Sequence, residues 1–115
     1  MNETNQTYSF PSDFWWGSAA SGPQTEGAAK EDGRKPSIWD YWYSKQPECF
    51  HGEVGPEHTS NFYHMYKEDI QLMKKTGHNS FRTSIQWSRL IPDGKGTINE
   101  KAVQFYNDVI NELIA

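Results

Sequence analysis

The sequence predicts an α/β fold that opens with two consecutive units of a strand followed by a helix. Residues 14–16 and 79–87 are rich in the aromatic and β-branched side chains that favour strands. Residues 60–76, and those from 99 onward, instead carry apolar side chains at the spacing of one helical face. The order strand, helix, strand, helix is typical of the opening of a parallel sheet.

The first strand is predicted over residues 14–16, where three aromatic side chains bring large apolar surface. Glycine and proline then interrupt any regular element, at Gly17, Gly22, Pro23 and Gly27. Gln24 and Glu26 stand among them, so the sequence predicts a polar site at the end of a strand. The alternative hypothesis is an ordinary surface loop in which both side chains are simply solvated.

A short helix and an irregular loop are predicted next. Ser37 precedes residues 38–43 and can cap a helical turn that packs Trp and Tyr rings. Residues 46–56 contain two prolines and two glycines, which favour an irregular loop.

A longer helix is predicted from a cap at Thr59 or Ser60 through Thr76, with Gly77 at the C-terminal cap. Its spacing of four, four and three residues predicts one buried stripe. The stripe consists of Phe62, Tyr66, Ile70 and Met73.

The second strand alternates apolar and polar side chains. One face carries Phe81, Thr83, Ile85 and Trp87, and the other carries Ser80, Arg82, Ser84 and Gln86. In an isolated sheet the polar face would meet water. In a closed parallel barrel it would point inward, where Arg82 needs a carboxylate partner. Both hypotheses are compatible with the alternation.

The second helix is predicted after a turn at residues 92–94, with Asn99 as its cap. The expected buried stripe is Val103, Tyr106, Ile110 and Leu113. The sequence stops within this periodic stretch at Ala115, without a capping glycine or a following proline.

Composition argues against nucleic-acid and membrane partners. The net charge is −4 with the two signs interspersed, which gives no basic surface for phosphate backbones. No apolar run approaches the roughly 18 residues of a membrane span, and no signal peptide is evident at the N-terminus. The single cysteine, Cys49, is compatible with a reducing compartment. These features predict part of a cytoplasmic protein.

No metal or cofactor is expected. The histidines and the cysteine lack the short spacing that zinc sites use on a turn or a helix face. They are His51, His58, His64, His78 and Cys49.

Two parts of the sequence carry recognisable motifs. The run 14–27 is FWWGSAASGPQTEG, and residues 66–74 and 81–89 are YKEDIQLMK and FRTSIQWSR. These motifs resemble glycoside hydrolase family 1. The first is similar to the family's F-x-W-G-x-A-x-S strand followed by Q-x-E-G, and the others are similar to its Y-K-E-D and Y-R-x-S-I-x-W-x-R segments. Gly22-Pro23 stands where most members carry Ala-Tyr, and this variant resembles the branch with bacterial 6-phospho-β-glucosidases.

The resemblance implies a (β/α)₈ TIM barrel, which typically needs about 250 residues. The 115 residues correspond to the first two β/α units, so we expect 1–115 to be the N-terminal fragment of a single catalytic domain. The remainder of the barrel would be required for activity.

The resemblance also implies a retaining glycosidase with two catalytic carboxyl groups. The family carries them in N-E-P and T-E-N-G motifs, and neither occurs here, so no catalytic residue is expected in this chain. Thr25-Glu26-Gly27 echoes the second motif but lacks its asparagine, so Glu26 is interpreted as a structural carboxylate. By motif, Gln24 matches the glutamine that binds sugar hydroxyls, and Arg82 matches the arginine that supports the nucleophile.

Three hypotheses follow. The first is the N-terminal part of a β-glycosidase that acts on 6-phospho-β-glucosides. The second is a plain β-glucosidase with an unphosphorylated β-glucoside as substrate. The third is a separate sugar-binding or interaction module that uses exposed aromatic side chains.

Overall fold

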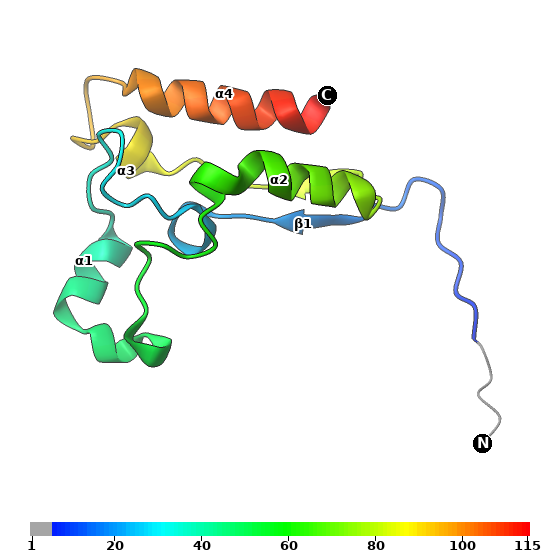
Figure 1. Ribbon diagram of the computed structural model, residues 1–115, viewed down its shortest axis with the longest axis horizontal. Coiled ribbons are helices and arrows are strands. Elements are labelled where there is room, and N and C mark those ends of the chain that lie inside the picture. Colours follow the sequence, from blue (N-terminus) through cyan, green and yellow to red (C-terminus); the bar gives the residue numbers. More distant parts are fainter. Residues whose placement is uncertain (1–5) are drawn as a thin grey trace.

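The computed structural model describes residues 6–115 and arranges them as two parallel strands with two long helices packed on one side (Figure 1). In chain order the elements are β1 (Gly17–Ala19), a single π-helical turn (Gly22–Glu26), α1 (Ile38–Lys45), two 3₁₀ turns (Pro47–Cys49 and His51–Glu53), α2 (Phe62–Lys75), β2 (Ser80–Arg82), α3 (Trp87–Leu90) and α4 (Glu100–Ile114). The predicted order of strand, helix, strand and helix is confirmed.

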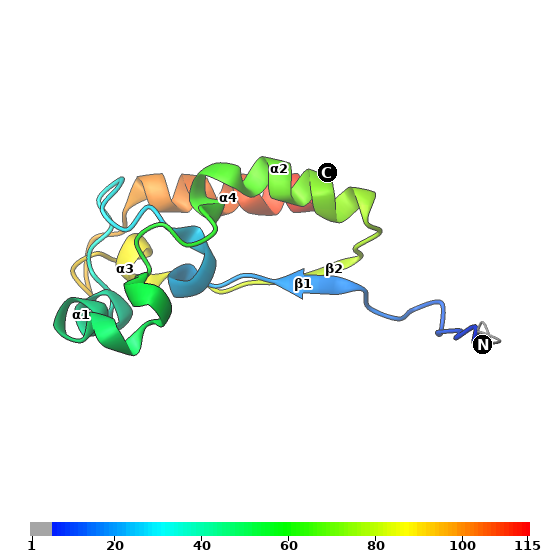
Figure 2. The ribbon, with the colours of Figure 1, turned by 60° about the horizontal axis from the view of Figure 1, so that its bottom comes forward.

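The two strands pair in parallel, with Gly17 opposite Ser80 and Ala19 opposite Arg82. α2 connects them by running back along the sheet, as the two ribbon views show (Figures 1 and 2). Because the carboxyl ends of parallel strands lie at the same edge, the segments that follow Ala19 and Arg82 begin side by side.

The first strand begins three residues later than predicted, so the expected strand at 14–16 is wrong. The side chain of Trp15 is 80% exposed, and pairing starts where the Trp16 carbonyl accepts from the Asn79 and Ser80 amides at 2.9 and 3.2 Å. A Cβ atom at Gly17 would overlap the Ser80 backbone. The close approach of the two strands therefore needs glycine at position 17. The sequence pattern instead predicts Gly17 to be among the residues that interrupt the strand.

The second strand is shorter than predicted, because pairing ends at Arg82 instead of continuing to Trp87. After Ala19 the chain of β1 turns away into the π-helical turn, so residues 83–86 have no strand partner within 6–115. Residues 87–90 then form α3, which the alternating pattern did not predict.

The core lies between the sheet and the two long helices, α2 and α4, which lie side by side (Figures 1 and 2). Its buried members are Phe62, Ile70, Ala102, Phe105, Tyr106 and Val109. The predicted stripe of α2 is confirmed, because Phe62 and Ile70 are buried and Tyr66 and Met73 pack against them. Phe81 of β2 packs on the same core, with its ring centroid 6.1 Å from that of Phe62.

The predicted stripe of α4 is partly wrong. Tyr106 is buried, but Ile110 is 49% exposed, and Phe105 and Val109 occupy the core in its place. The helix is rotated toward α2 so that the Phe105 ring lies 4.4 Å from that of Tyr63. This cross-helix contact cannot be inferred from the periodicity of α4 alone.

Three predicted caps are confirmed. Ser37 and Asp40 form a reciprocal capping box at the start of α1, and the Asn99 side chain accepts from the Lys101 amide at the start of α4. Gly77, with φ of 80°, follows α2 in the left-handed conformation that glycine favours.

The cap predicted for α2 at Thr59 or Ser60 is wrong. The residue before the helix is Asn61, whose φ of 56° is left-handed. The Ser60 hydroxyl instead donates to the Thr25 carbonyl at 3.1 Å, which ties the entry of α2 to the π-helical turn.

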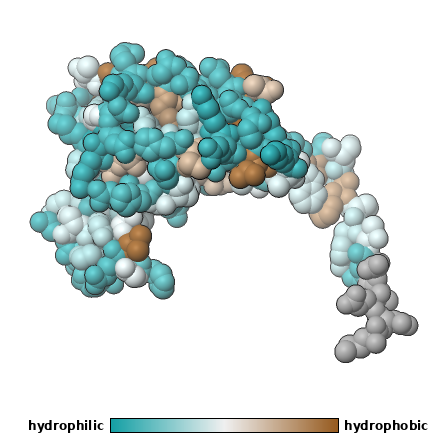
Figure 3. Space-filling model, viewed as in Figure 1, coloured by the Kyte–Doolittle hydropathy of each residue, from teal (hydrophilic) through white to brown (hydrophobic). Residues whose placement is uncertain are grey.

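The surface view is largely hydrophilic, with scattered apolar side chains (Figure 3). Several large apolar side chains of the described chain are nevertheless exposed, including Trp16, Ile38, Ile85, Trp87 and Ile114. Within residues 6–115, none of the helices has the length and apolar character needed to cross a bilayer.

Candidate active site

The predicted site residues lie at one edge of the sheet. Arg82 is the last residue of β2, and its carbonyl accepts from the amide of Ala20 at 2.9 Å. Gln24 lies in the π-helical turn that follows β1. Both therefore come from segments at the carboxyl ends of neighbouring parallel strands, which is where barrel enzymes place their active sites.

Gln24 is exposed in a turn that is fixed by its own hydrogen bonds. The Thr25 amide and hydroxyl both donate to the Ser21 carbonyl, at 2.9 and 2.8 Å. The Ser21 hydroxyl donates to Oε1 of Gln24 at 2.9 Å. The amide nitrogen of Gln24 has no partner among residues 6–115, so it can donate to a ligand.

Arg82 is exposed and forms no ion pair or side-chain hydrogen bond with any residue of the described part, 6–115. Its neighbour Phe81 packs toward the helices, and successive side chains of a strand point to opposite faces. Arg82 thus belongs to the sheet face away from α2 and α4, which would be the interior of a closed barrel. Its guanidinium can pair with a carboxylate there.

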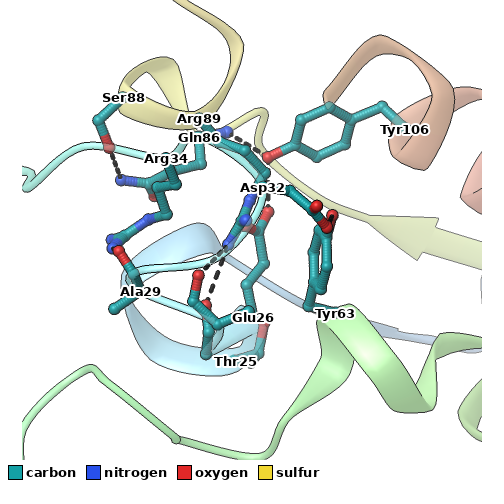
Figure 4. Close-up of polar contacts among 12 residues, drawn as sticks. Thr25, Glu26, Ala29, Asp32, Arg34, Tyr63, Gln86, Ser88, Arg89 and Tyr106 are labelled. Carbon is teal, nitrogen blue, oxygen red and sulfur yellow. Dashed lines mark hydrogen bonds and ion pairs between the residues drawn. The ribbon is translucent and has the colours of Figure 1, made fainter. Parts of the chain in front are cut away.

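A buried polar network joins the π-helical turn to α3 and α4 (Figure 4). The Glu26 carboxylate accepts from Nε of Arg89 at 2.9 Å and from the Tyr106 hydroxyl at 2.7 Å. Glu26, Arg89 and Tyr106 are 3%, 0% and 8% exposed. Glu26 is therefore a buried structural carboxylate, in keeping with its interpretation from the sequence.

The network extends through Arg89 and Tyr106. The Arg89 guanidinium also donates to the Gly27 carbonyl at 3.0 Å and stacks over the Tyr63 ring at 4.2 Å. Burial is the main cause that raises the pKa of Tyr106 above its usual value, and the negative charge of Glu26 is the second. The hydroxyl of Tyr106 therefore remains protonated and donates to Glu26.

A second group of polar contacts joins the loop after the π-helical turn to α2 and α4. Asp32 accepts from Nζ of Lys101 at 2.8 Å and from the Tyr63 hydroxyl at 2.7 Å, and these bonds lower the pKa of Asp32. Burial and the bond to Asp32 raise the pKa of Tyr63 to about 12. These contacts fasten the loop after the π-helical turn to α2 and α4.

A third polar contact holds the start of α1. Arg34 is buried and donates to Asp40 at 2.8 Å and to the Ala29 carbonyl at 2.8 Å. Partial burial opposes ionisation of Asp40, but hydrogen bonds from Ser37 and Arg34 outweigh it and lower the pKa of this carboxyl group.

Local sequence patterns did not predict the roles of Arg89 and Arg34. Arg89 stands at the end of the F-R-T-S-I-Q-W-S-R segment, and Glu26 stands in the Q-T-E-G segment. Both belong to the motifs that carried the family resemblance, yet 63 positions separate them. Only the folded structure reveals that they pair.

The histidines occupy separate places. His64 shares a hydrogen bond with Glu31 at 2.9 Å, and His78 shares one with Thr76 at 2.9 Å. No group of three or more His, Cys, Asp or Glu side chains that could hold a metal ion occurs in the described residues. Cys49 is exposed.

A shallow hollow of about 330 Å³ adjoins Gln24. Much of its wall is apolar and comes from α1 and the segment between α1 and α2, with Trp39, Phe50, Val54 and Pro56 among the lining residues. The turn that carries Gln24 thus borders a surface of the kind that can contact a small molecule.

Comparison with known proteins decides the family. The sequence model of glycosyl hydrolase family 1 matches residues 6–115. The chain belongs to glycosyl hydrolase family 1. It is 64% identical over its full length to the 6-phospho-beta-glucosidase GmuD of Bacillus subtilis, of which it spans 24%. It is 52% identical over 107 residues to beta-glucosidase 21 of rice, covering 91% of this chain and 20% of that protein.

The structural comparison agrees. The aphid myrosinase structure superposes with a TM-score of 0.88 at 36% identity, covering 93% of this chain and 23% of that one. The described residues thus form the N-terminal portion of the glycosyl hydrolase family 1 barrel, and its first two β/α units leave an open two-stranded sheet. The predicted fold class is confirmed.

Proposed function

We propose that this chain is the N-terminal part of a retaining β-glycosidase that hydrolyses 6-phospho-β-glucosides. The observation that carries the proposal is the 64% identity, over the whole of this chain, to a 6-phospho-beta-glucosidase. The rice beta-glucosidase, at 52% over 91% of the chain, is less similar. Residues 1–115 would form one incomplete catalytic domain.

Two side chains of this chain would serve the reaction. Gln24 would bind neighbouring sugar hydroxyls, because one amide can donate to one hydroxyl and accept from another. Arg82 would hold the nucleophilic carboxylate ionised through charge-assisted hydrogen bonds. Two observations support these roles. Both residues lie at the carboxyl ends of neighbouring parallel strands, and both present free hydrogen-bond donors.

The catalytic carboxyl groups would come from segments outside residues 1–115. Retaining enzymes hold an acid/base and a nucleophile about 5–5.5 Å apart, so that a covalent glycosyl intermediate forms and water then hydrolyses it. The motifs that carry both groups in the family do not occur in this sequence. We therefore expect the 115 residues alone to be inactive.

A plain β-glucosidase is the second candidate. The similarity to rice beta-glucosidase 21 favours it, because the segment shared with that protein includes both proposed site residues. Family membership favours either enzyme over a separate sugar-binding module. A phosphorylated sugar carries about −1.5 to −2 charges at pH 7 and does not cross membranes unaided, so the first candidate implies action in the cytoplasm.

A chimera tests the proposal. Residues 1–115 replace the matching N-terminal quarter of the Bacillus subtilis relative, and hydrolysis of p-nitrophenyl β-D-glucoside and of its 6-phosphate is compared with that by the unaltered relative. We expect kcat/KM for the 6-phosphate to stay close to that of the unaltered relative. A loss confined to the 6-phosphate would support the second candidate, and hydrolysis of neither substrate by a folded chimera would contradict both.

A further inference from the structure

The π-helical turn that carries Gln24 is not held by sequence-local contacts alone. Glu26 is the last residue of this turn, and its carboxylate is buried against Arg89 of α3 and Tyr106 of α4. Arg89 also donates to the carbonyl of Gly27. Contacts from α3 and α4, which are distant from the turn in the sequence, therefore hold the backbone of the turn in place.

The same network reaches the segment that follows Arg82. The Tyr106 hydroxyl accepts from the backbone amide of Gln86 at 2.8 Å while it donates to Glu26. Gln86 is only 8% exposed and lies four positions after Arg82. One hydroxyl group thus joins the turn after β1 to the segment after β2.

A steric contact reinforces this link. The Gln86 side chain lies against Gly22, the first residue of the π-helical turn, and a Cβ atom at Gly22 would overlap it. The turn therefore touches Gln86 at its first residue and joins it through Tyr106 at its last.

We propose that Glu26, Arg89 and Tyr106 are positioning residues, which set the turn that presents Gln24 relative to the segment that presents Arg82. This inference rests on the proposed function, because it assigns those two side chains to one active site. A displacement of about 1 Å between groups that bind and activate a substrate can lower the rate about 100-fold. The network controls that displacement without contact with the substrate.

The test uses Tyr106→Phe in the chimera that carries residues 1–115. This change removes the shared hydroxyl and retains the ring in the core. Tyr63→Phe is the matched control, because it removes a hydroxyl that donates to Asp32 at 2.7 Å and lies outside the link between Glu26 and Gln86.

We expect Tyr106→Phe to lower kcat/KM by about 10-fold to 100-fold and Tyr63→Phe by less than about twofold. If Tyr106 acts through the position of Gln24, its effect should shrink to less than about twofold when Gln24→Ala is already present. Two effects that simply multiply would indicate a general structural loss and would overturn the proposal.

Hydrogen exchange gives a readout that does not depend on activity. The Thr25 amide is protected by its bond to the Ser21 carbonyl. We expect Tyr106→Phe to speed its exchange several-fold in the folded chimera, and Tyr63→Phe to leave it unchanged. An unchanged Thr25 exchange rate in Tyr106→Phe would refute the positioning role. If the chimera hydrolyses no β-glucoside, the proposed function fails, while Thr25 exchange still decides this inference.

Discussion

Breaking the ion pair between Glu26 and Arg89 should lower the free energy of unfolding strongly. Its side chains are 4% and 0% exposed. Arg89→Met keeps an unbranched apolar side chain against the Tyr63 ring but leaves the Glu26 carboxylate with Tyr106 as its remaining side-chain donor. Removing one partner of a buried pair costs about 3–5 kcal/mol, so we expect a loss of that size in the free energy of unfolding.

Replacing both partners should be less harmful than the single effects suggest. In Glu26→Gln/Arg89→Met no unpaired charge remains, and the new amide can still accept from Tyr106. We expect a coupling of about 2 kcal/mol in the double-mutant cycle, measured by urea unfolding of the chimera. The control is the pair of Lys30 and Glu57, whose side chains are 82% and 46% exposed.

Breaking that surface pair with Lys30→Met should cost about 0–1 kcal/mol. A cost for Arg89→Met within this range, or a coupling near zero, would refute the claim that the buried pair organises this end of the fold.

Three further outcomes follow from the same structure. The isolated 115 residues should hydrolyse neither p-nitrophenyl β-D-glucoside nor its 6-phosphate, and turnover that a substitution within them abolishes would contradict the absence of catalytic carboxyl groups. In the chimera, Gln24→Ala should lower kcat/KM by the equivalent of about 1–3 kcal/mol, because sugar hydroxyls lose their partner; steady-state kinetics check this. Because hydrogen bonds lower the pKa of Asp40, the wild type's stability advantage over Asp40→Asn should be full above the usual value of 3.8 and disappear as the pH falls through the lower folded value. Urea unfolding between about pH 2 and 7 measures it, and a pH-independent difference would contradict this assignment.

The sequence predicted those parts of the fold that local rules determine. The stripe of α2 and the caps at Ser37, Asn99 and Gly77 each depend on residues within a few positions of one another. The strand at 14–16 was misplaced because pairing with Ser80 sets its position, and the backbone contact at Gly17 makes that pairing possible.

Only part of the candidate site was predicted, again because local patterns do not show contacts between distant residues. Motif resemblance identified Gln24 and Arg82, whose proposed roles remain predictions. The buried pair of Glu26 and Arg89 joins residues 63 positions apart, so no local pattern could show that their side chains meet. The rotation of α4, which buries Phe105 in place of Ile110, likewise depends on contacts with α2.

The central claim is that β1 and β2 present Gln24 and Arg82 to one glycosidase active site. The pH–rate profile of Arg82→Met in the chimera tests it most directly. Loss of the guanidinium should raise the pKa of the nucleophilic carboxyl group, moving the acidic limb of the profile upward by about 1–3 pH units and lowering the maximum rate. An unchanged rate and an unchanged profile would show that Arg82 does not support the nucleophile, and the central claim would then be wrong.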